Sequence, residues 1–158
     1  MIKYIENMTD VVFAELPDEV SLAINISNCQ NNCVGCFEAF LKENIGKELN
    51  EDELMHLISK EPDVTAVLFM GEGNDPEMLK SLAKLVKKST NLKVGLYSGR
   101  EEVEDELYDI FDYIKVGPYK AEFGPLRSKT TNQRLYGIKD GKKTDITYKF
   151  WEHDFDLK

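Results

Sequence analysis

Strand-like and helix-like patterns alternate along the middle of the chain, and this alternation constrains the fold more than any other feature. Residues 64–70, VTAVLFM, are almost continuously apolar, which is typical of a strand covered on both faces. Asp75 and Pro76 follow as an N-cap and a first helical position, and leucines then recur at helical spacing. The order of strand, helix and strand returns in residues 92–98, 100–111 and 113–117. Such an alternation predicts parallel β-α units with right-handed crossovers.

The alternation begins earlier in the chain. Residues 20–27, VSLAINIS, alternate apolar and polar side chains and predict a strand that leads directly into a cysteine-containing segment. Residues 50–61 predict a helix, because Asn50 and Glu53 form a capping-box pattern in front of an apolar stripe. The cysteines are therefore expected just beyond the carboxyl end of a strand.

The last part of the chain has a different pattern. Residues 118–133 predict a long irregular segment, and residues 134–138 and 145–151 predict a hairpin around the turn KDGKK. A complete barrel of eight β-α units takes about 250 residues, so this chain can form only part of one. We expect a single domain over residues 1–158 with an α/β fold: an open partial (β/α) barrel of mostly parallel strands, followed by a short irregular and hairpin segment.

Composition excludes some classes of partner. The net charge of −9 disfavours nucleic acid, because phosphate binding requires a basic surface. No stretch approaches the roughly 20 apolar residues of a membrane span, and the first residues lack the order of a signal peptide, so we expect a cytoplasmic protein without membrane contact. Residues 115–149 carry nine Lys or Arg against three acidic residues, a local +6. This segment predicts either a solvated basic face or a docking surface for an acidic partner.

All three cysteines lie within eight positions, as Cys29, Cys33 and Cys36 in a C-x3-C-x2-C pattern. Iron–sulfur cubanes normally take four thiolates, so three would leave one iron open to a substrate. A structural zinc site is an alternative, but its fourth ligand would have to be His56 or His153, and neither belongs to a zinc knuckle. Three unrelated buried cysteines are a further alternative, although the Asn- and Gly-rich surroundings do not resemble a core.

Two glycine-containing segments end predicted strands. MGEGND covers residues 70–75, and LYSGR covers residues 96–100. Glycine lets a ligand approach the backbone, whose N–H groups can then bind a carboxylate or another polar group. Both segments fall at the carboxyl ends of adjacent predicted parallel strands, where α/β folds build their sites. A simple turn remains the alternative for each segment.

The cysteine spacing is that of the radical S-adenosylmethionine (SAM) enzymes. With CQNNCVGCF, FMGEGNDPE, LYSGREE, FDYIKVGPY and TTNQRLY in this order, the chain resembles the activating proteins of anaerobic, class III ribonucleoside-triphosphate reductases over roughly residues 16–138. The resemblance implies the radical SAM type of partial barrel for the fold predicted above.

The same resemblance implies the cofactors and their ligands. Cys29, Cys33 and Cys36 would hold a 4Fe-4S cluster, and the amino and carboxylate groups of SAM would bind the open iron. In the family the glycine segment has adjacent glycines, so a glutamate between two glycines is a departure here. The residues that the resemblance places against SAM are Gly35, Cys36, Phe37, Gly71, Glu72, Gly73, Tyr97, Ser98 and Gly99.

The implied reaction is reductive. An electron from flavodoxin or a ferredoxin-type donor would cleave SAM to methionine and a 5′-deoxyadenosyl radical, which would abstract hydrogen from a backbone glycine of the reductase. The cofactors carry this chemistry, and no catalytic side chain is required. From the local positive charge alone, we expect Arg127, Lys129 and Arg134 to help dock the reductase or the cofactor. The alternatives are a radical SAM enzyme that modifies a small molecule or another peptide, and a zinc-stabilised binding module without chemistry.

Overall fold

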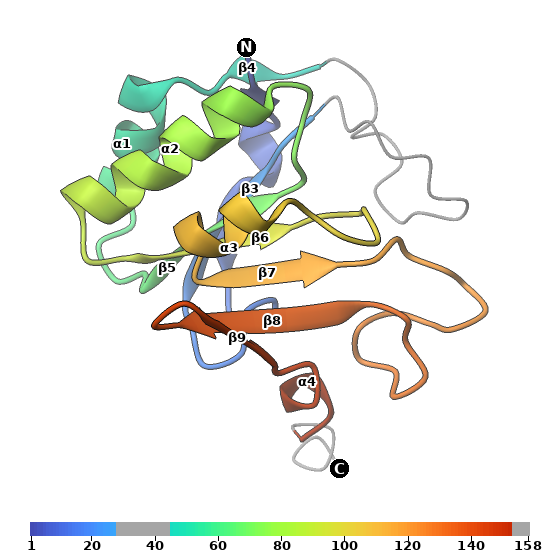
Figure 1. Cartoon of the computed structure of the whole chain (residues 1–158). Helices are drawn as coiled ribbons and strands as arrows, with labels where there is room; N and C mark the ends of the chain where they lie inside the picture. The colour runs from blue at the N-terminus through green and yellow to red at the C-terminus, as the bar shows by residue number, and fades with distance from the viewer. Residues whose placement is uncertain (28–44, 153–158) are drawn as a thin grey trace.

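The structure is a computed structural model that describes residues 1–27 and 45–152, and these residues form a seven-stranded sheet with helices packed on it (Figure 1). In spatial order the strands of this sheet are β2 (Asp10–Val12), β3 (Ser21–Asn25), β5 (Ala66–Met70), β6 (Lys93–Tyr97), β7 (Tyr113–Val116), β8 (Arg134–Lys139) and β9 (Lys142–Asp145). The other elements are β1 (Lys3–Tyr4), the 3-10 helix η1 (Glu6–Met8), β4 (Lys47–Glu48), α1 (Glu51–Ser59), α2 (Pro76–Ser89), α3 (Asp105–Ile110) and α4 (Lys149–Glu152).

The predicted open partial barrel of the radical SAM type is wrong. The described part of the chain is an α/β protein with a mixed sheet, and its longest helix, α2, has 14 residues. β3, β5, β6 and β7 pair in parallel, but β2 pairs antiparallel with β3, and β8 and β9 add antiparallel pairings beyond β7. The physical reason is that the chain reverses after β7, so that β8 returns beside it without a helical crossover.

Local signals for the helix starts are confirmed. The side chain of Asn50 accepts a hydrogen bond from the Glu53 backbone N–H at 2.9 Å, and Asp75 accepts one from the Met78 backbone N–H at 3.1 Å. Each side chain satisfies an N–H that has no partner within the helix. The helix predicted for residues 100–111 is shorter than expected. The predicted hairpin is present, but its second strand lies earlier in the chain, and α4 replaces its predicted end.

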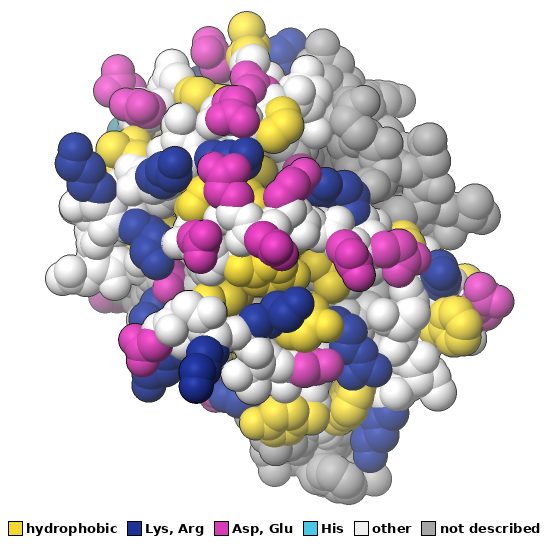
Figure 2. Space-filling view, in the orientation of Figure 1, with side chains coloured by type: hydrophobic (Ala, Val, Ile, Leu, Met, Phe, Trp, Pro, Cys, Tyr) yellow, Lys and Arg dark blue, Asp and Glu magenta, His cyan; other side chains and the backbone are white. Residues whose placement is uncertain are grey.

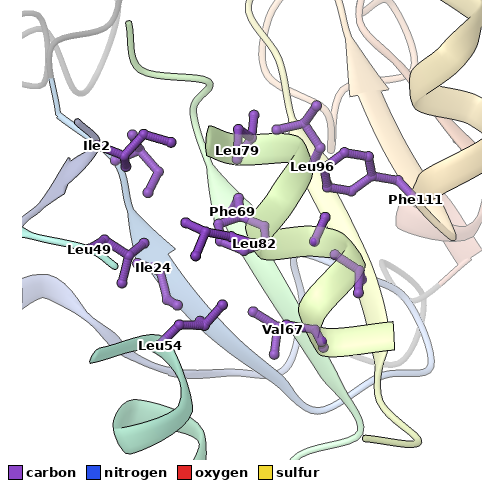
Figure 3. Close-up of a cluster of buried hydrophobic side chains, with 14 of the residues drawn as sticks. Ile2, Ile24, Leu49, Leu54, Val67, Phe69, Leu79, Leu82, Leu96 and Phe111 are labelled. Atoms are coloured by element: carbon purple, nitrogen blue, oxygen red, sulfur yellow. The ribbon is translucent and has the colours of Figure 1, made fainter. Parts of the chain in front are cut away.

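Helices α1, α2 and α3 cover one face of the sheet (Figure 1). Alternate residues of the parallel strands point toward them, and Phe69 and Leu96 pack with Leu79 and Leu82 of α2 (Figure 3). The rings of Phe69 and Phe111 meet edge to face, with their centroids 6.4 Å apart. Burial of each large apolar side chain stabilises the fold by roughly 1.5–3 kcal/mol. This layer is the main hydrophobic core.

The opposite face of the sheet is filled by segments from the two ends of the described chain. Leu16, in the connection between β2 and β3, is buried against Gly95 of β6, where an added Cβ would lie 2.8 Å from the Leu16 Cδ1. Phe150 and Trp151 pack into the same apolar cluster. In the predicted barrel this face would have lined the interior, whereas here apolar side chains occupy it.

Within the described ranges, no helix has both the length and the apolar character needed to span a membrane.

Candidate functional site

The carboxyl ends of four neighbouring parallel strands meet at one edge of the sheet. Asn25, Met70, Tyr97 and Lys115 are register partners across β3, β5, β6 and β7. The backbone pairing continues one residue further, because the N–H of Ile26 donates to Met70 O at 3.0 Å, that of Gly71 to Tyr97 O at 3.0 Å and that of Ser98 to Lys115 O at 2.8 Å. The segments that leave these strands therefore begin side by side.

The glycine loop after β5 packs on the residues that lead into the cysteine segment. Gly71 and Gly73 have φ angles of 110° and 69°, which a residue with a side chain rarely adopts. An added Cβ would lie 3.3 Å from Ile26 O at Gly71 and 2.9 Å from the Ile26 Cγ2 at Gly73, with Ser27 O at 3.6 Å. Close packing on Ile26 and Ser27 thus explains both glycines. Their contact with a cofactor remains a prediction.

Glu72, between the two glycines, is held by hydrogen bonds from Ser98 and Arg100 to its carboxylate. The Ser98 hydroxyl donates to Glu72 Oε2 at 2.6 Å, the Arg100 Nε donates to the same oxygen at 2.9 Å, and the Arg100 Nη2 donates to Oε1 at 2.5 Å. Arg100 also contacts both carboxylate oxygens of Glu104 at 2.9 Å. The network ties the loop after β5 to the loop after β6.

The network changes the proton affinity of its exposed members. Hydrogen bonds to Glu104 and then to Glu72 raise the pKa of Arg100, so the guanidinium stays charged. The hydrogen bond from Arg100 lowers the pKa of Glu104 to about 2. Ser98 is fully buried, and its oxygen also accepts the backbone N–H of Arg100 at 3.1 Å. The hydroxyl predicted to lie near the SAM sugar therefore already has protein partners for both its donor and an acceptor site.

Tyr97 points to the sheet face opposite the helices. Its hydroxyl donates to Glu15 O, and the Tyr113 hydroxyl donates to Glu19 Oε2 at 2.7 Å, so both tyrosines fasten residues 13–20 to the sheet. Burial raises the pKa of Tyr97, and burial followed by the bond to Glu19 raises that of Tyr113. Both hydroxyls thus stay protonated near neutral pH. Sequence reasoning missed this role of residues 13–20, and no periodic pattern there could have indicated it.

Two buried polar residues flank the same edge. The amide nitrogen of Asn25 donates to Met8 O at 2.8 Å, while its side-chain oxygen has no hydrogen-bond partner among the described residues. Lys115 is buried, and its Nζ lies 3.2 Å from Gly117 O and 5.4 Å from the centre of the Tyr97 ring. The backbone N–H of Gly117 donates to Arg100 O at 2.6 Å, which joins the loops after β6 and β7. Polar groups are thus concentrated where the parallel strands end.

Several predicted site residues lie outside the described residues. The cluster ligands Cys29, Cys33 and Cys36, and their neighbours Gly35 and Phe37, belong to residues 28–44. The structure does bring the other predicted residues together at one edge, in Gly71–Gly73 and in the segment 97–99, although Tyr97 points its hydroxyl elsewhere. Over residues 1–27 and 45–152, His, Cys, Asp and Glu side chains do not gather in any group of three suited to a metal ion.

A second polar cluster lies around the start of α1, and its member Tyr4 forms a β-bridge with Ile26 just beyond the end of β3. Lys47 Nζ is 2.7 Å from Glu53 Oε2, and the buried Tyr4 hydroxyl donates to the same oxygen at 3.1 Å. Burial, with Glu53 as the next cause, raises the pKa of Tyr4 to about 12. Lys47 and Glu53 line an open pocket together with Glu48, Asn50, Asp52 and His56. His56 is exposed on α1.

Comparison with protein-family models, curated proteins and solved structures gives no match for this chain.

Proposed function

We propose that this chain is an iron–sulfur enzyme that cleaves SAM by reduction. Within that class, the proposed activity is that of an activating enzyme, which generates a glycyl radical on an anaerobic ribonucleoside-triphosphate reductase. The proposal concerns the chemistry and not the partial barrel, which the mixed sheet replaces. Flavodoxin or a ferredoxin-type protein is the proposed electron donor.

The observation that carries the proposal is the packing of the glycine loop on Ile26 and Ser27. These two residues lead directly into the segment that holds all three cysteines of the chain. A cofactor bound through that segment would begin beside the loop after β5 and extend toward the loop after β6, because their strands are in register. Binding sites of α/β proteins lie at this end of parallel strands.

The donor set fits the proposed cluster. Three thiolates suit an iron–sulfur cubane with one open iron, and elsewhere in the described ranges no group of three metal ligands competes for it. When bound, the cluster would pass an electron to SAM and break its carbon–sulfur bond. The protein's part is to bind and orient: the backbone of Gly71–Gly73 borders the site, and the pair formed by Glu72 and Arg100 fixes that loop against β6.

A second candidate is a zinc-stabilised binding module. It is favoured by the mixed sheet and by the internal partners of Ser98 and Glu72, which use polar groups that a SAM site would otherwise employ. A tetrahedral structural zinc needs a fourth ligand, and His56 and His153 are the histidines of the chain. The two candidates therefore differ in their metal and in their need for imidazole.

The test begins with anaerobic reconstitution with iron and sulfide. The proposal expects about four irons and four sulfides per chain, and formation of 5′-deoxyadenosine once SAM and a low-potential reductant are added. Adding the reductase subunit encoded by the same genome should then give the electron paramagnetic resonance doublet of a glycyl radical. A colourless protein with one zinc would refute the enzyme assignment. SAM cleavage without the doublet would reassign the substrate to a small molecule or another peptide.

Two variants make the test specific. Cys33→Ser should lose both the cluster and SAM cleavage, because a single thiolate is removed from a three-ligand set. The control is the double variant His56→Ala/His153→Ala, which should keep the full iron content. If His56→Ala/His153→Ala lost its metal while Cys33→Ser kept half of the metal content of the wild type, the result would point to a zinc site.

A further inference from the structure

Residues 117–133 connect β7 to β8 as a loop whose two ends are tied together. The Gln133 Nε2 donates to Gly117 O at 3.3 Å, and the Asn132 Nδ2 donates to Pro118 O at 3.0 Å. Gly117 has a φ of 99°, and a Cβ there would lie 3.1 Å from the Gln133 Cα, so glycine permits the close approach. The loop therefore leaves and rejoins the sheet at one place, as in an Ω-loop.

Bonds inside the loop fix its shape. The Thr130 hydroxyl donates to Phe123 O at 2.6 Å, the backbone N–H of Gly124 donates to Lys120 O at 3.0 Å, and that of Ser128 donates to Pro125 O at 2.9 Å. A loop with these internal bonds loses little conformational entropy when a partner binds. Its outer side chains are thus presented on a preorganised frame.

The outer surface of the loop combines an exposed aromatic ring with positive charge. Phe123 is 41% exposed. Lys120, Arg127 and Lys129 against Glu122 give the loop a net charge of +2 in a chain of −9. In Figure 2, dark-blue and yellow side chains lie near one another at the right of the molecule, where Figure 1 places this loop. Aromatic and basic side chains are enriched in the contacts that dominate protein interfaces.

Other basic side chains of the segment 115–149 are engaged elsewhere in the fold. Arg134 Nη1 lies 3.6 Å from Asp145 Oδ2. Lys143 Nζ lies 4.7 Å from the ring centre of Tyr108 and 4.6 Å from that of Tyr136. Within the loop, Lys120 Nζ lies 3.4 Å from Glu101 Oε1. We assign the docking role expected for Arg134 to the loop because the side chains of Arg127 and Lys129 are exposed, whereas Arg134 is only partly exposed.

We propose that residues 117–133 dock an acidic segment of a protein partner, with an apolar side chain of that segment covering Phe123. This inference depends on the proposed function in one respect, because it takes the anaerobic reductase as the partner. The charge of the loop selects an acidic surface. The position of the loop, where β7 ends, would bring that surface to the edge at which β3, β5 and β6 also end.

The β8–β9 turn provides a matched control. Lys139 and Lys142 are exposed and flank this turn, and the register of β7 with β8 pairs Val116 with Arg134 and Tyr113 with Gly137. The turn therefore lies at the opposite edge of the sheet from the loop. Reversing two charges there changes the net charge by the same amount as reversing two charges in the loop.

The experiment measures the Kd of the purified reductase subunit for the reconstituted protein, at low and at high salt. Arg127→Glu/Lys129→Glu should weaken binding about 10- to 100-fold at low salt, and Phe123→Ala about tenfold at either salt concentration. Lys139→Glu/Lys142→Glu should stay within about twofold of the wild type. Formation of 5′-deoxyadenosine without the reductase should be the same in the wild type, in Phe123→Ala and in Lys139→Glu/Lys142→Glu.

Each outcome decides the proposal. An unchanged Kd in both loop variants, or an equal loss in the control, would overturn it, as would a wild type that cleaves SAM without binding the reductase. If the wild type forms no 5′-deoxyadenosine but binds the reductase more tightly than the loop variants do, the docking proposal is supported and the proposed function fails. Loop-dependent binding of a single-stranded oligonucleotide in place of the reductase would assign the loop to nucleic acid. If the charge-reversed protein does not fold, Phe123→Ala carries the test alone.

Discussion

The ion pair between Glu72 and Arg100 should be the strongest polar link between the loops after β5 and β6. Two hydrogen bonds join the two side chains, and Ser98 adds a third to the same carboxylate. The side chain of Glu72 is 17% exposed and that of Arg100 is 36% exposed, whereas that of Glu104 is 56% exposed. Arg100 therefore has one sheltered and one exposed partner of the same chemical type.

The difference in exposure between Glu72 and Glu104 sets the expected coupling energy of each with Arg100. A hydrogen bond to a charged group contributes about 1.5–3 kcal/mol, and the partial exposure of Arg100 places the expected coupling with Glu72 near the lower limit, about 1.5 kcal/mol. An exposed ion pair contributes about 0.2–1 kcal/mol, and a value near 0.5 kcal/mol is the expectation for Arg100 with Glu104, which both precede α3. Arg100→Met, which breaks both pairs, should cost about 2 kcal/mol and lower Tm by roughly 4–8 °C.

The assay is a pair of double-mutant cycles measured by urea denaturation. One cycle combines Glu72→Gln with Arg100→Met, and the other combines Glu104→Gln with Arg100→Met. Trp151, the single tryptophan, reports unfolding because its indole N–H donates to Leu126 O at 3.0 Å in the folded protein. A coupling for Glu72 that is no larger than the coupling for Glu104 would refute the argument that burial of the carboxylate decides the strength of these pairs.

Two further predictions concern the same edge. Gly73→Ala should cost about 2 kcal/mol, because its φ is 69° and the new Cβ would lie 2.9 Å from the Ile26 Cγ2. Gly141→Ala, with φ 77° but no atom within 4 Å of the new Cβ, should cost about 1 kcal/mol in the same urea assay, and equal losses would contradict the steric argument. The pKa of Glu104 is lowered from 4.5 to about 2 by Arg100, so its stabilising contribution is present above pH 4.5 and is lost as the pH falls toward 2. Urea titrations of wild type and Glu104→Gln should therefore differ by less than about 1 kcal/mol at neutral pH and converge over that acidic range, and a difference that grew on acidification would be incompatible with this sign.

The sequence predicts the elements whose signals are local. Asn50 and Asp75 cap their helices as expected, because an N-cap bond spans three residues and needs no distant partner. The strands β5 and β6 lie within the predicted segments, since an apolar run between turn residues is itself a local pattern. These features could be read from short windows of residues.

The pairing of strands beyond the parallel core could not be read in this way. β2 is a three-residue strand without a periodic pattern, and its partner β3 is chosen by contacts that form only in the fold. The antiparallel return of β8 depends on how Gly117 and Gln133 close the loop between them, sixteen residues apart. The partial barrel was predicted from the order of strands and helices, from the chain length and from the resemblance, and none of these fixes whether the next strand runs parallel or antiparallel.

In the candidate site, too, the sequence predicts the local features but not the contacts between distant residues. Its position at the carboxyl ends of the strands follows from the order of the elements, and the register confirms that the two glycine segments are neighbours. The partners of individual hydroxyls do not follow from that order. The Tyr97 hydroxyl binds the backbone of Glu15, 82 residues away, and the Ser98 hydroxyl binds Glu72 in the loop after β5. The resemblance had assigned both side chains to the cofactor because they stand at the strand end that the family places near SAM.

The antiparallel return of β8 also determines where the loop between β7 and β8 lies. In a parallel β-α unit the chain leaves a strand at the carboxyl edge and must cross to the opposite edge before the next strand begins. β8 runs antiparallel to β7, with Val116 opposite Arg134, so the connection between them starts and ends at the same edge. Residues 117–133 therefore begin and end at the carboxyl end of β7, where Gly117 N–H donates to Arg100 O, and Leu126 of this loop packs on the apolar cluster opposite the helices. The mixed topology that rules out the barrel thus places a basic and partly apolar loop at the carboxyl end of β7, on the side of the sheet where β3, β5 and β6 also end, and the proposed docking of a protein partner depends on this placement.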